Sequence, residues 1–211
     1  LGGWDDMDSI MRNMDSELNS ILQEITDEYG VHVIAQNPEG FVGIVATKEP
    51  TNWNSFDDKG MNIRVWSSNV IKSMVEELGY QATTMAWGDI FPAIQSGIFA
   101  QSDVGTHFVE YNSISELTTY YASQRTLDKL NDEQRDALTA AMTKASDDFF
   151  VYNRENDEVF GQKLIDSGYT ILRLSDEEHA AMAARVQETI WPMMAENVGQ
   201  DIIERLLADK N

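Results

Sequence analysis

One arginine interrupts a short run of apolar residues in the stretch DKGMNIRVWSSN, at residues 58–69. Residues 62–66 alternate as a β-strand does, so Arg64 is expected on the opposite face from Ile63 and Val65. An arginine in such a strand either keeps a surface soluble or holds an anion, because its guanidinium grips a carboxylate through two parallel hydrogen bonds. The spacing alone leaves both interpretations open.

Aromatic and acidic side chains follow this arginine closely. Trp66 lies two residues further on and is expected on the same face, and MAWGD at residues 85–89 ends the next predicted strand. Ligands of α/β sheets collect beyond the carboxyl ends of strands, near helix N-termini. Trp87 and Asp89 could therefore share a cleft with Arg64, with indoles as its flat walls. The alternative is a surface arginine beside two core tryptophans.

The sequence carries no recognisable catalytic or cofactor motif. It has no cysteine, and its three histidines (His32, His107 and His179) lack metal-ligand spacing. Phosphate-binding loops, dinucleotide-binding glycine motifs and serine-nucleophile elbows are absent from it. Carboxylates are so numerous that the pattern selects no acid–base pair. We therefore expect no catalytic residue, no metal site and no cofactor, and interpret the site as one for binding.

The charge balance limits the possible partners. The chain has 211 residues with 36 acidic and 15 basic side chains, a formal net charge of −21. Such a surface repels nucleic acid and anionic lipid headgroups. High solubility, for example in a salty habitat, is favoured over an acidic surface built for a partner. No apolar run approaches the roughly 20 residues of a membrane span, and no signal-peptide pattern is visible.

Helices and strands alternate along the first half of the chain, which is typical of a mostly parallel sheet covered by helices. The Arg64 strand leads into a helix that Ser68 or Asn69 caps, and Asp89 is expected to cap a later one. The turn residues Asn37, Pro38 and Gly40 separate two early strands. The predicted helices are 7–29, 69–78, 88–97 and 113–122, and the predicted strands are 31–36, 41–47, 62–66, 81–87 and 98–100.

The second half is mostly helical. A capping-box sequence, NDEQ at 131–134, opens one long helix to about Ser167, or two helices in line. A strand is predicted over 169–174. The sequence SDEE at 175–178 is a second capping box, and the helix that it opens should kink or break at Pro192. A last helix is predicted over 201–209.

Residues 58–98 closely resemble the central segment of the TRAP-transporter solute-binding proteins, which are extracytoplasmic receptors for organic acids. The family's motifs appear here in order as Lys59-Gly60, Ile63-Arg64-Val65, Leu78-Gly79, TMAWGD and FPAIQSG. Residues 169–207 are similar to the family's closing strand and helices.

The resemblance implies an α/β, periplasmic-binding-protein-like, two-lobed fold with mixed sheets and a long lobe-spanning helix. Residues 1–65 would form part of the first lobe, whose N-terminal portion is expected to precede Leu1. Residues 66–124 would form the second lobe. The long helix, a returning strand and the C-terminal helices would occupy 125–211. One family strand, which would stand between residues 124 and 125, is absent from the sequence.

The resemblance also implies how a ligand is bound. Arg64 would form a salt bridge with the ligand carboxylate, the lobes would close around the ligand, and a membrane permease would receive it. Many members carry a second arginine where this chain has Val42, so we expect a monocarboxylate, such as a keto or hydroxy acid. Asp103, Thr106 and His107 are further candidate contacts in a divergent turn, where His107 is either an anion-binding donor or a solvent-facing residue.

We therefore expect a periplasmic receptor of a TRAP transporter, monomeric or dimeric, and not an enzyme. Its partners would be a small organic acid and the permease subunits. Three alternatives stay open: a sensor protein of the same fold, a carboxylate-based hydrolase or lyase, and a structural domain without a small ligand. The candidate ligand-binding residues are Arg64, Trp66, Trp87, Asp89, Asp103, Thr106 and His107.

Overall fold

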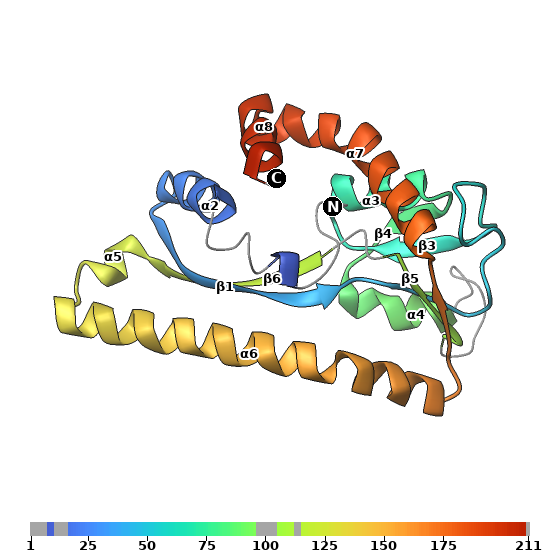
Figure 1. Ribbon diagram of the computed structural model, residues 1–211, viewed down its shortest axis with the longest axis horizontal. Coiled ribbons are helices and arrows are strands. Elements are labelled where there is room, and N and C mark those ends of the chain that lie inside the picture. The colour runs from blue at the N-terminus through green and yellow to red at the C-terminus, as the bar shows by residue number, and fades with distance from the viewer. Residues whose placement is uncertain (1–7, 11–16, 96–104, 112–114, 210–211) are drawn as a thin grey trace. The chain divides into compact units, whose positions relative to one another are not determined.

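The computed structural model describes residues 8–10, 17–95, 105–111 and 115–209, which fall into two compact units (Figure 1). Of the described residues, unit 1 contains 41–95, 105–111 and 160–200. Unit 2 contains 8–10, 17–40, 115–159 and 201–209. Each unit is assembled from separate stretches of the chain. The lobe boundaries that the resemblance implied, after residues 65 and 124, stay a prediction.

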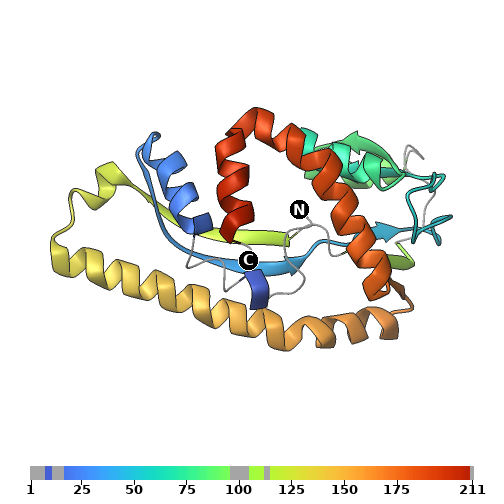
Figure 2. The ribbon, with the colours of Figure 1, turned by 45° about the horizontal axis from the view of Figure 1, so that its top comes forward.

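Unit 2 combines a two-stranded sheet with helices. Strand β1 (Val31–Phe41) pairs with β6 (Ser115–Ser123), and the long helix α6 runs along this pair in Figures 1 and 2. The hydroxyl of Ser146 in α6 donates to the carbonyl of Gln36 in β1 at 2.7 Å. The shorter helices of this unit are α2 (Glu17–Asp27), α5 (Gln124–Leu127) and α8 (Gln200–Asp209).

Helix α6 (Asp132–Asp166) is one uninterrupted helix of 35 residues. The predicted capping box is confirmed at its start, where the Gln134 amide donates to Oδ1 of Asn131 at 2.9 Å and the Asn131 amide donates to Oε1 of Gln134 at 3.0 Å. Residues 132–159 belong to unit 2 and the last turns to unit 1. One helix therefore continues from one unit into the other.

Unit 1 contains two sheets. In the three-stranded sheet, β5 (His107–Glu110) lies between β2 (Ile44–Ala46), which is antiparallel to it, and β7 (Thr170–Arg173), which is parallel. The second sheet pairs β3 (Asn62–Val65) and β4 (Gln81–Thr84) in parallel. The predicted mixture of strand directions is confirmed. The helical elements are α3 (Asn69–Glu77), the 3₁₀ turn η1 (Trp87–Asp89), α4 (Ile90–Gln95) and α7 (Asp176–Val198).

The core of unit 1 lies where α3 and α7 pack with the strands. Burial follows helical spacing on both helices, so each presents one apolar stripe to the core. Ser68 and Asn69 were the two predicted caps of α3, and the structure shows Ser68, whose side chain accepts a hydrogen bond from the Ile71 amide. The core side chains include Val65, Ile71, Met74, Val75, Leu78, Val109, Met182, Val186 and Ile190.

The helix predicted over 113–122 is wrong, because Ser115–Ser123 forms strand β6. Its β-branched and aromatic residues, Thr118, Thr119, Tyr120 and Tyr121, suit a half-buried pleated surface better than a helix. Pairing with β1 satisfies the backbone groups of this strand and decides its conformation.

The turn predicted at residues 37–40 is also wrong, because β1 runs without interruption from Val31 to Phe41. Among the described residues this sheet contains only β1 and β6, so one edge of β1 pairs with no other strand. A proline is tolerated on such an edge, where its missing N–H costs no ladder hydrogen bond. Pro38 and its neighbour Asn37 are buried in this strand.

A kink or break was predicted at Pro192. The break does not occur, because α7 continues to Val198, and the kink stays a prediction. Met182 and Ile190 are buried before the proline, and Met193 and Met194 pack against the same core after it. Burial on both sides offsets the cost of about 3 kcal/mol for an internal proline.

The remaining predicted elements differ mainly at their ends. The strand predicted over 81–87 ends at Thr84, because Trp87–Asp89 forms a 3₁₀ turn. Within the helix predicted over 7–29, residues 8–10 and Glu17–Asp27 are helical, and residues 28 and 29 form a turn. The strand predicted over 98–100 lies outside the described residues.

The second capping box provides a test of how α7 is anchored. The Ser175 side chain accepts from the Glu178 amide, and the Glu178 carboxylate accepts from the Ser175 amide at 2.8 Å. Ser175→Ala should lower the free energy of unfolding in urea by about 1 kcal/mol. Ser123→Ala is the matched control, because Ser123 precedes α5 without a side-chain capping bond. Equal losses in both variants would refute the capping role.

Candidate ligand-binding site

The β3–β4 sheet has one apolar and one polar face. Its register places Ile63 opposite Ala82 and Arg64 opposite Thr83, so the members of each pair share a face. Ile63, Val65 and Ala82 belong to or pack against the core of unit 1. The opposite face therefore carries three partly exposed polar side chains, those of Asn62, Arg64 and Thr83.

Arg64 is fixed by the turn that follows β4. Its Nε donates to the Met85 carbonyl at 2.9 Å, and its Cζ lies 5.6 Å from the centroid of the Trp87 ring. Because Nε is engaged, the two terminal nitrogens stay available to an anion that approaches end-on. The guanidinium is thus held in orientation by neutral groups.

Arg64 has no carboxylate partner among the residues that the structure describes, although the chain is strongly acidic. This contrasts with the arginines that do form ion pairs. Those arginines are Arg135, Arg154, Arg173, Arg185 and Arg205. A half-buried, oriented and unpaired guanidinium is suited to bind an anion from solution.

The structure brings Trp87 close to Arg64, whereas Trp66 is described only by its packing against the core of unit 1. Trp87 is 81% exposed, so most of its ring is free for a ligand. Strand β3 ends at Val65, and the partly buried Trp66 packs against the core of unit 1. The backbone amide of Asp89 donates a hydrogen bond to the Ala86 carbonyl and so closes the 3₁₀ turn. The side chain of Asp89 is exposed. The ligand-binding roles of Trp66 and Asp89, and the capping role of Asp89, stay predictions.

His107 begins β5, the middle strand of the three-stranded sheet, and Thr106 directly precedes it. The Thr106 hydroxyl donates to the Thr47 carbonyl at 3.0 Å and lies 2.9 Å from Nδ1 of His107. A hydroxyl has one hydrogen, so Nδ1 is the donor in the second contact, and a neutral His107 keeps only an acceptor at Nε2. His107 can therefore donate to an anion through Nε2 only when it is protonated. Asp103 lies outside the described residues.

The lysine of the Lys59-Gly60 motif has a structural position that the sequence did not reveal. Lys59 is 1% exposed, and its ammonium donates to the carbonyls of Ser55 and Asp57, the latter at 2.9 Å. Its amide donates to the Gly79 carbonyl at 2.9 Å. Burial lowers the pKa of Lys59, and the charges of Asp57 and Asp58 oppose that shift. Lys59 thus ties the loop before β3 to the end of α3.

A buried pair of tyrosines joins the same loop to the core. The hydroxyls of Tyr80 and Tyr111 are 2.7 Å apart, and Tyr111 donates to the Trp53 carbonyl at 2.8 Å, so Tyr80 is the donor within the pair. Burial raises the pKa of Tyr80 to about 12. Burial is also the main cause of a raised pKa at Tyr111.

Alkaline unfolding should report on these tyrosines. Each phenol loses its proton near pH 10.0 in the unfolded chain but keeps it to higher pH when folded. Stability should therefore fall as pH rises from 10 towards 12, by about 1.4 kcal/mol per pH unit for each tyrosine. Lys59 has the opposite effect on stability. Because its pKa is lowered in the folded protein, its contribution to stability rises with pH until the pH reaches its ordinary pKa of 10.5.

Urea unfolding between pH 8 and 11.5 measures this slope. The double variant Tyr80→Phe, Tyr111→Phe should show a flatter decline above pH 10, whatever its stability at pH 8. Tyr29→Phe is the control, because Tyr29 is 79% exposed. Parallel slopes in the wild-type protein and the double variant would contradict the assignment.

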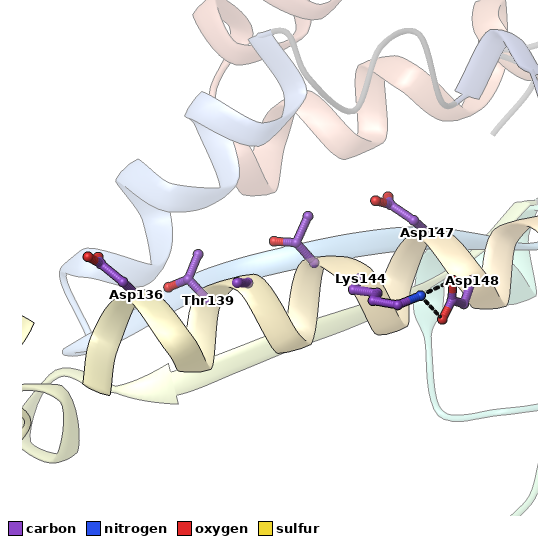
Figure 3. Close-up of a pocket in the computed structure, with 7 residues that line it drawn as sticks. Asp136, Thr139, Lys144, Asp147 and Asp148 are labelled. Carbon is purple, nitrogen blue, oxygen red and sulfur yellow. Dashed lines mark hydrogen bonds and ion pairs between the residues drawn. The ribbon is translucent and has the colours of Figure 1, made fainter. Parts of the chain in front are cut away.

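One hollow among the described residues contains none of the predicted ligand-binding residues. It lies in unit 2 along α6, with a volume of about 570 Å³, and three aspartates line it (Figure 3). Its lysine, Lys144, is engaged at 2.7 Å by both carboxylate oxygens of Asp148. An anion would meet an excess of negative charge there, so we do not assign the ligand site to this hollow.

The described residues offer neither a metal site nor a membrane span. They contain no group of three metal-ligating side chains that could hold an ion. None of the described helices is long and apolar enough to cross a bilayer.

The described strands and helices give the chain an α/β fold. The family model of the bacterial extracellular solute-binding proteins, family 7, matches residues 4–197, and the chain belongs to this family. The resemblance stated from the sequence is confirmed. The family is one of binding proteins, which confirms that the chain is not an enzyme and removes the hydrolase or lyase alternative.

Two curated relatives are ectoine-binding proteins by name. The ectoine-binding periplasmic protein TeaA of Halomonas elongata is 23% identical over 97% of this chain and 65% of its own length. The ectoine/5-hydroxyectoine-binding periplasmic protein UehA of Ruegeria pomeroyi is 21% identical over 91% of this chain and 61% of its own length. The chain thus spans less than two thirds of these relatives.

Solved structures confirm the fold class. A TRAP periplasmic solute-binding protein from Ralstonia eutropha, with bound (S)-2-acetolactate, superposes with a TM-score of 0.84 at 15% identity, over 99% of this chain and 71% of that one. The ectoine-binding protein of the TeaABC TRAP transporter of Halomonas elongata gives 0.79 at 22% identity, over 97% of this chain and 72% of that one. At these identities the likeness concerns the fold alone.

Proposed function

We propose that this protein is the extracytoplasmic receptor of a TRAP-type transporter. It captures a small organic monocarboxylate through a salt bridge to Arg64 and delivers it to the membrane permease. The observation that carries the proposal is the state of Arg64: half-buried, oriented by Met85 and Trp87, and without a carboxylate partner among the described residues.

The geometry around Arg64 favours a carboxylate over other anions. With Nε donating to the Met85 carbonyl, Nη1 and Nη2 present two parallel donors, the arrangement that a planar carboxylate accepts. The exposed Trp87 ring beside the guanidinium supplies an apolar wall for the ligand's carbon atoms. Binding therefore combines one charged contact with one aromatic surface.

The residue at position 42 supports a single carboxylate. Val42 is partly buried and packs against the core of unit 1, so the second arginine of many family members has no counterpart there. The family's solved structures include one with bound D-glucuronate and one with bound succinate, so both monoacids and diacids occur among its ligands. We assign this chain to the monoacid group.

The remaining partners follow from the family. Thr106, His107, Asp89 and Trp66 are proposed as further ligand contacts. Closure of two lobes around the ligand would remove the salt bridge from water and strengthen it. The permease is proposed as partner because the relative TeaA belongs to the TeaABC TRAP transporter. TeaA and UehA are periplasmic proteins, and we propose the same location for this chain.

A titration of monoacids against diacids tests the ligand class. Isothermal titration with propionate, pyruvate, lactate, succinate and malate should give tighter binding for the best monoacid than for either diacid, because a second carboxylate would meet no cation. Tighter binding of succinate than of every monoacid would overturn the monocarboxylate assignment. Heat only from dilution with every acid would overturn the receptor proposal itself.

A further inference from the structure

A second polar element shares the sheet face of Arg64. The Thr83 hydroxyl in β4 donates to Oδ1 of Asn62 in β3 at 3.0 Å. We propose that Asn62, held by Thr83, donates its amide hydrogens to an oxygen on the carbon next to the ligand carboxylate. The site would then select 2-oxo and 2-hydroxy acids over unsubstituted and 2-amino acids. This inference rests on the proposed function and adds a specificity-determining residue to it.

The hydrogen bond sets the direction of the Asn62 amide. Thr83 has one hydroxyl hydrogen, and Oδ1 of Asn62 receives it, so the amide nitrogen points away from Thr83 with both hydrogens. No described residue accepts from this nitrogen. Both side chains are only partly exposed, so the amide has a defined orientation and lacks an acceptor.

The strand brings this amide to the ligand. Asn62 and Arg64 are two residues apart on β3, so their side chains share a face and their Cα atoms lie about 7 Å apart. The arginine side chain is long and its terminal nitrogens are free, whereas asparagine is short. A ligand along the strand, with its carboxylate at Arg64, would therefore place its neighbouring substituent near Asn62.

The chemistry of the two groups sets the selectivity. The terminal nitrogens of Arg64 and the amide nitrogen of Asn62 are donors, so a keto or hydroxyl oxygen is accepted at the second position. A 2-ammonium group would meet these donors and would bring a second positive charge close to the guanidinium. A ligand with no substituent would leave the amide desolvated and unpaired, which costs affinity.

The simpler interpretation is that Asn62 and Thr83 only join β3 to β4. In that case their loss would lower stability and weaken all acids equally. Thr83 is a positioning residue in our proposal, since it acts through Asn62. Thr83→Ser keeps the hydroxyl, whereas Thr83→Val keeps the shape and removes it, so this pair separates orientation from packing.

The experiment is isothermal titration of two matched pairs, lactate with propionate and 2-hydroxybutyrate with butyrate. Wild type should bind the hydroxylated member of each pair about tenfold more tightly. Asn62→Ala should reduce this ratio to about two or less, and Thr83→Val should reduce it partly. Thr83→Ser and the control Asn197→Ala, an exposed asparagine of α7, should keep the wild-type ratio.

The outcomes separate this inference from the proposed function. If both members of each pair bind equally to wild type, and Arg64→Ala still abolishes binding, the receptor stands and the role of Asn62 is overturned. An equal loss for both members in Asn62→Ala would assign the pair to structure and also overturn it. If none of the four acids binds, the proposed function fails, and this inference fails with it.

Discussion

Replacement of Arg64 by alanine should abolish the stabilisation that a small monocarboxylate gives to the wild-type protein. A ligand at about 100 times its Kd stabilises the folded protein by about 2.7 kcal/mol, a rise of roughly 5 to 11 °C in Tm. Removal of one partner of a hydrogen-bonded charge pair costs about 2–5 kcal/mol of binding free energy. The variant should therefore show almost no shift at the same concentration.

Two further variants make this result specific. Arg64→Lys keeps the charge but loses the paired donors, so its affinity should lie between those of wild type and Arg64→Ala. Arg173→Ala is the matched control, because Arg173 is an exposed strand arginine of unit 1 that pairs with Glu110. Differential scanning fluorimetry with and without acid measures all four proteins. Equal shifts in wild type and Arg64→Ala would show that the acid binds elsewhere.

Replacement of Gly79 by alanine should give a large loss of stability. Gly79 has a φ of +90°, where an L side chain is strained, and an added Cβ would lie 2.2 Å from the Asp57 carbonyl oxygen and 2.8 Å from that of Phe56. The loop must then move away, which disturbs the hydrogen bonds of Lys59. We expect a loss of about 3 kcal/mol or more, measured by urea unfolding.

A second glycine separates strain from the clash. Gly168 has a φ of +92°, but a Cβ added there would meet nothing within 4 Å. Gly168→Ala should therefore cost only the backbone strain, about 1–2 kcal/mol. Equal losses at the two positions would show that the 55–59 loop does not constrain the end of α3. If Gly79→Ala also binds the carboxylic acid ligand more weakly than wild type, the 55–59 loop also holds β3 in position.

Local signals predicted several elements of the fold well. Both capping boxes begin helices, since the reciprocal bonds at Asn131–Gln134 and Ser175–Glu178 need only neighbouring residues. The β3–α3–β4 segment was also predicted, with its strand ends shifted. These features depend on residues within a few positions of each other, which a sequence displays directly.

Tertiary pairing decided the elements for which the sequence-based prediction was wrong. Strand β6 and the uninterrupted β1 form because they pair with each other, across more than seventy positions of the chain. The continuity of α7 at Pro192 depends on a core that lies mostly earlier in the sequence. The helix or strand preference of a short sequence segment depends on its own residues, so it does not reflect pairing with distant segments.

The site shows the same division. The alternation of residues 62–65 correctly placed Arg64 opposite the core face. The contacts of Arg64 with Met85 and Trp87 required the parallel register of β3 and β4, and the packing of Trp66 against the core was not visible in the sequence. The Thr83–Asn62 bond was likewise hidden, because it joins residues 21 positions apart.

The most direct test of the central claim is a crystal structure of the protein grown with the monoacid that raises Tm most. We predict that the ligand carboxylate lies end-on to Arg64, with one oxygen about 2.8 Å from each terminal nitrogen and the Trp87 ring beside the ligand's carbon chain. The acid at another place, or Arg64 paired with a carboxylate of the protein itself, would contradict this claim.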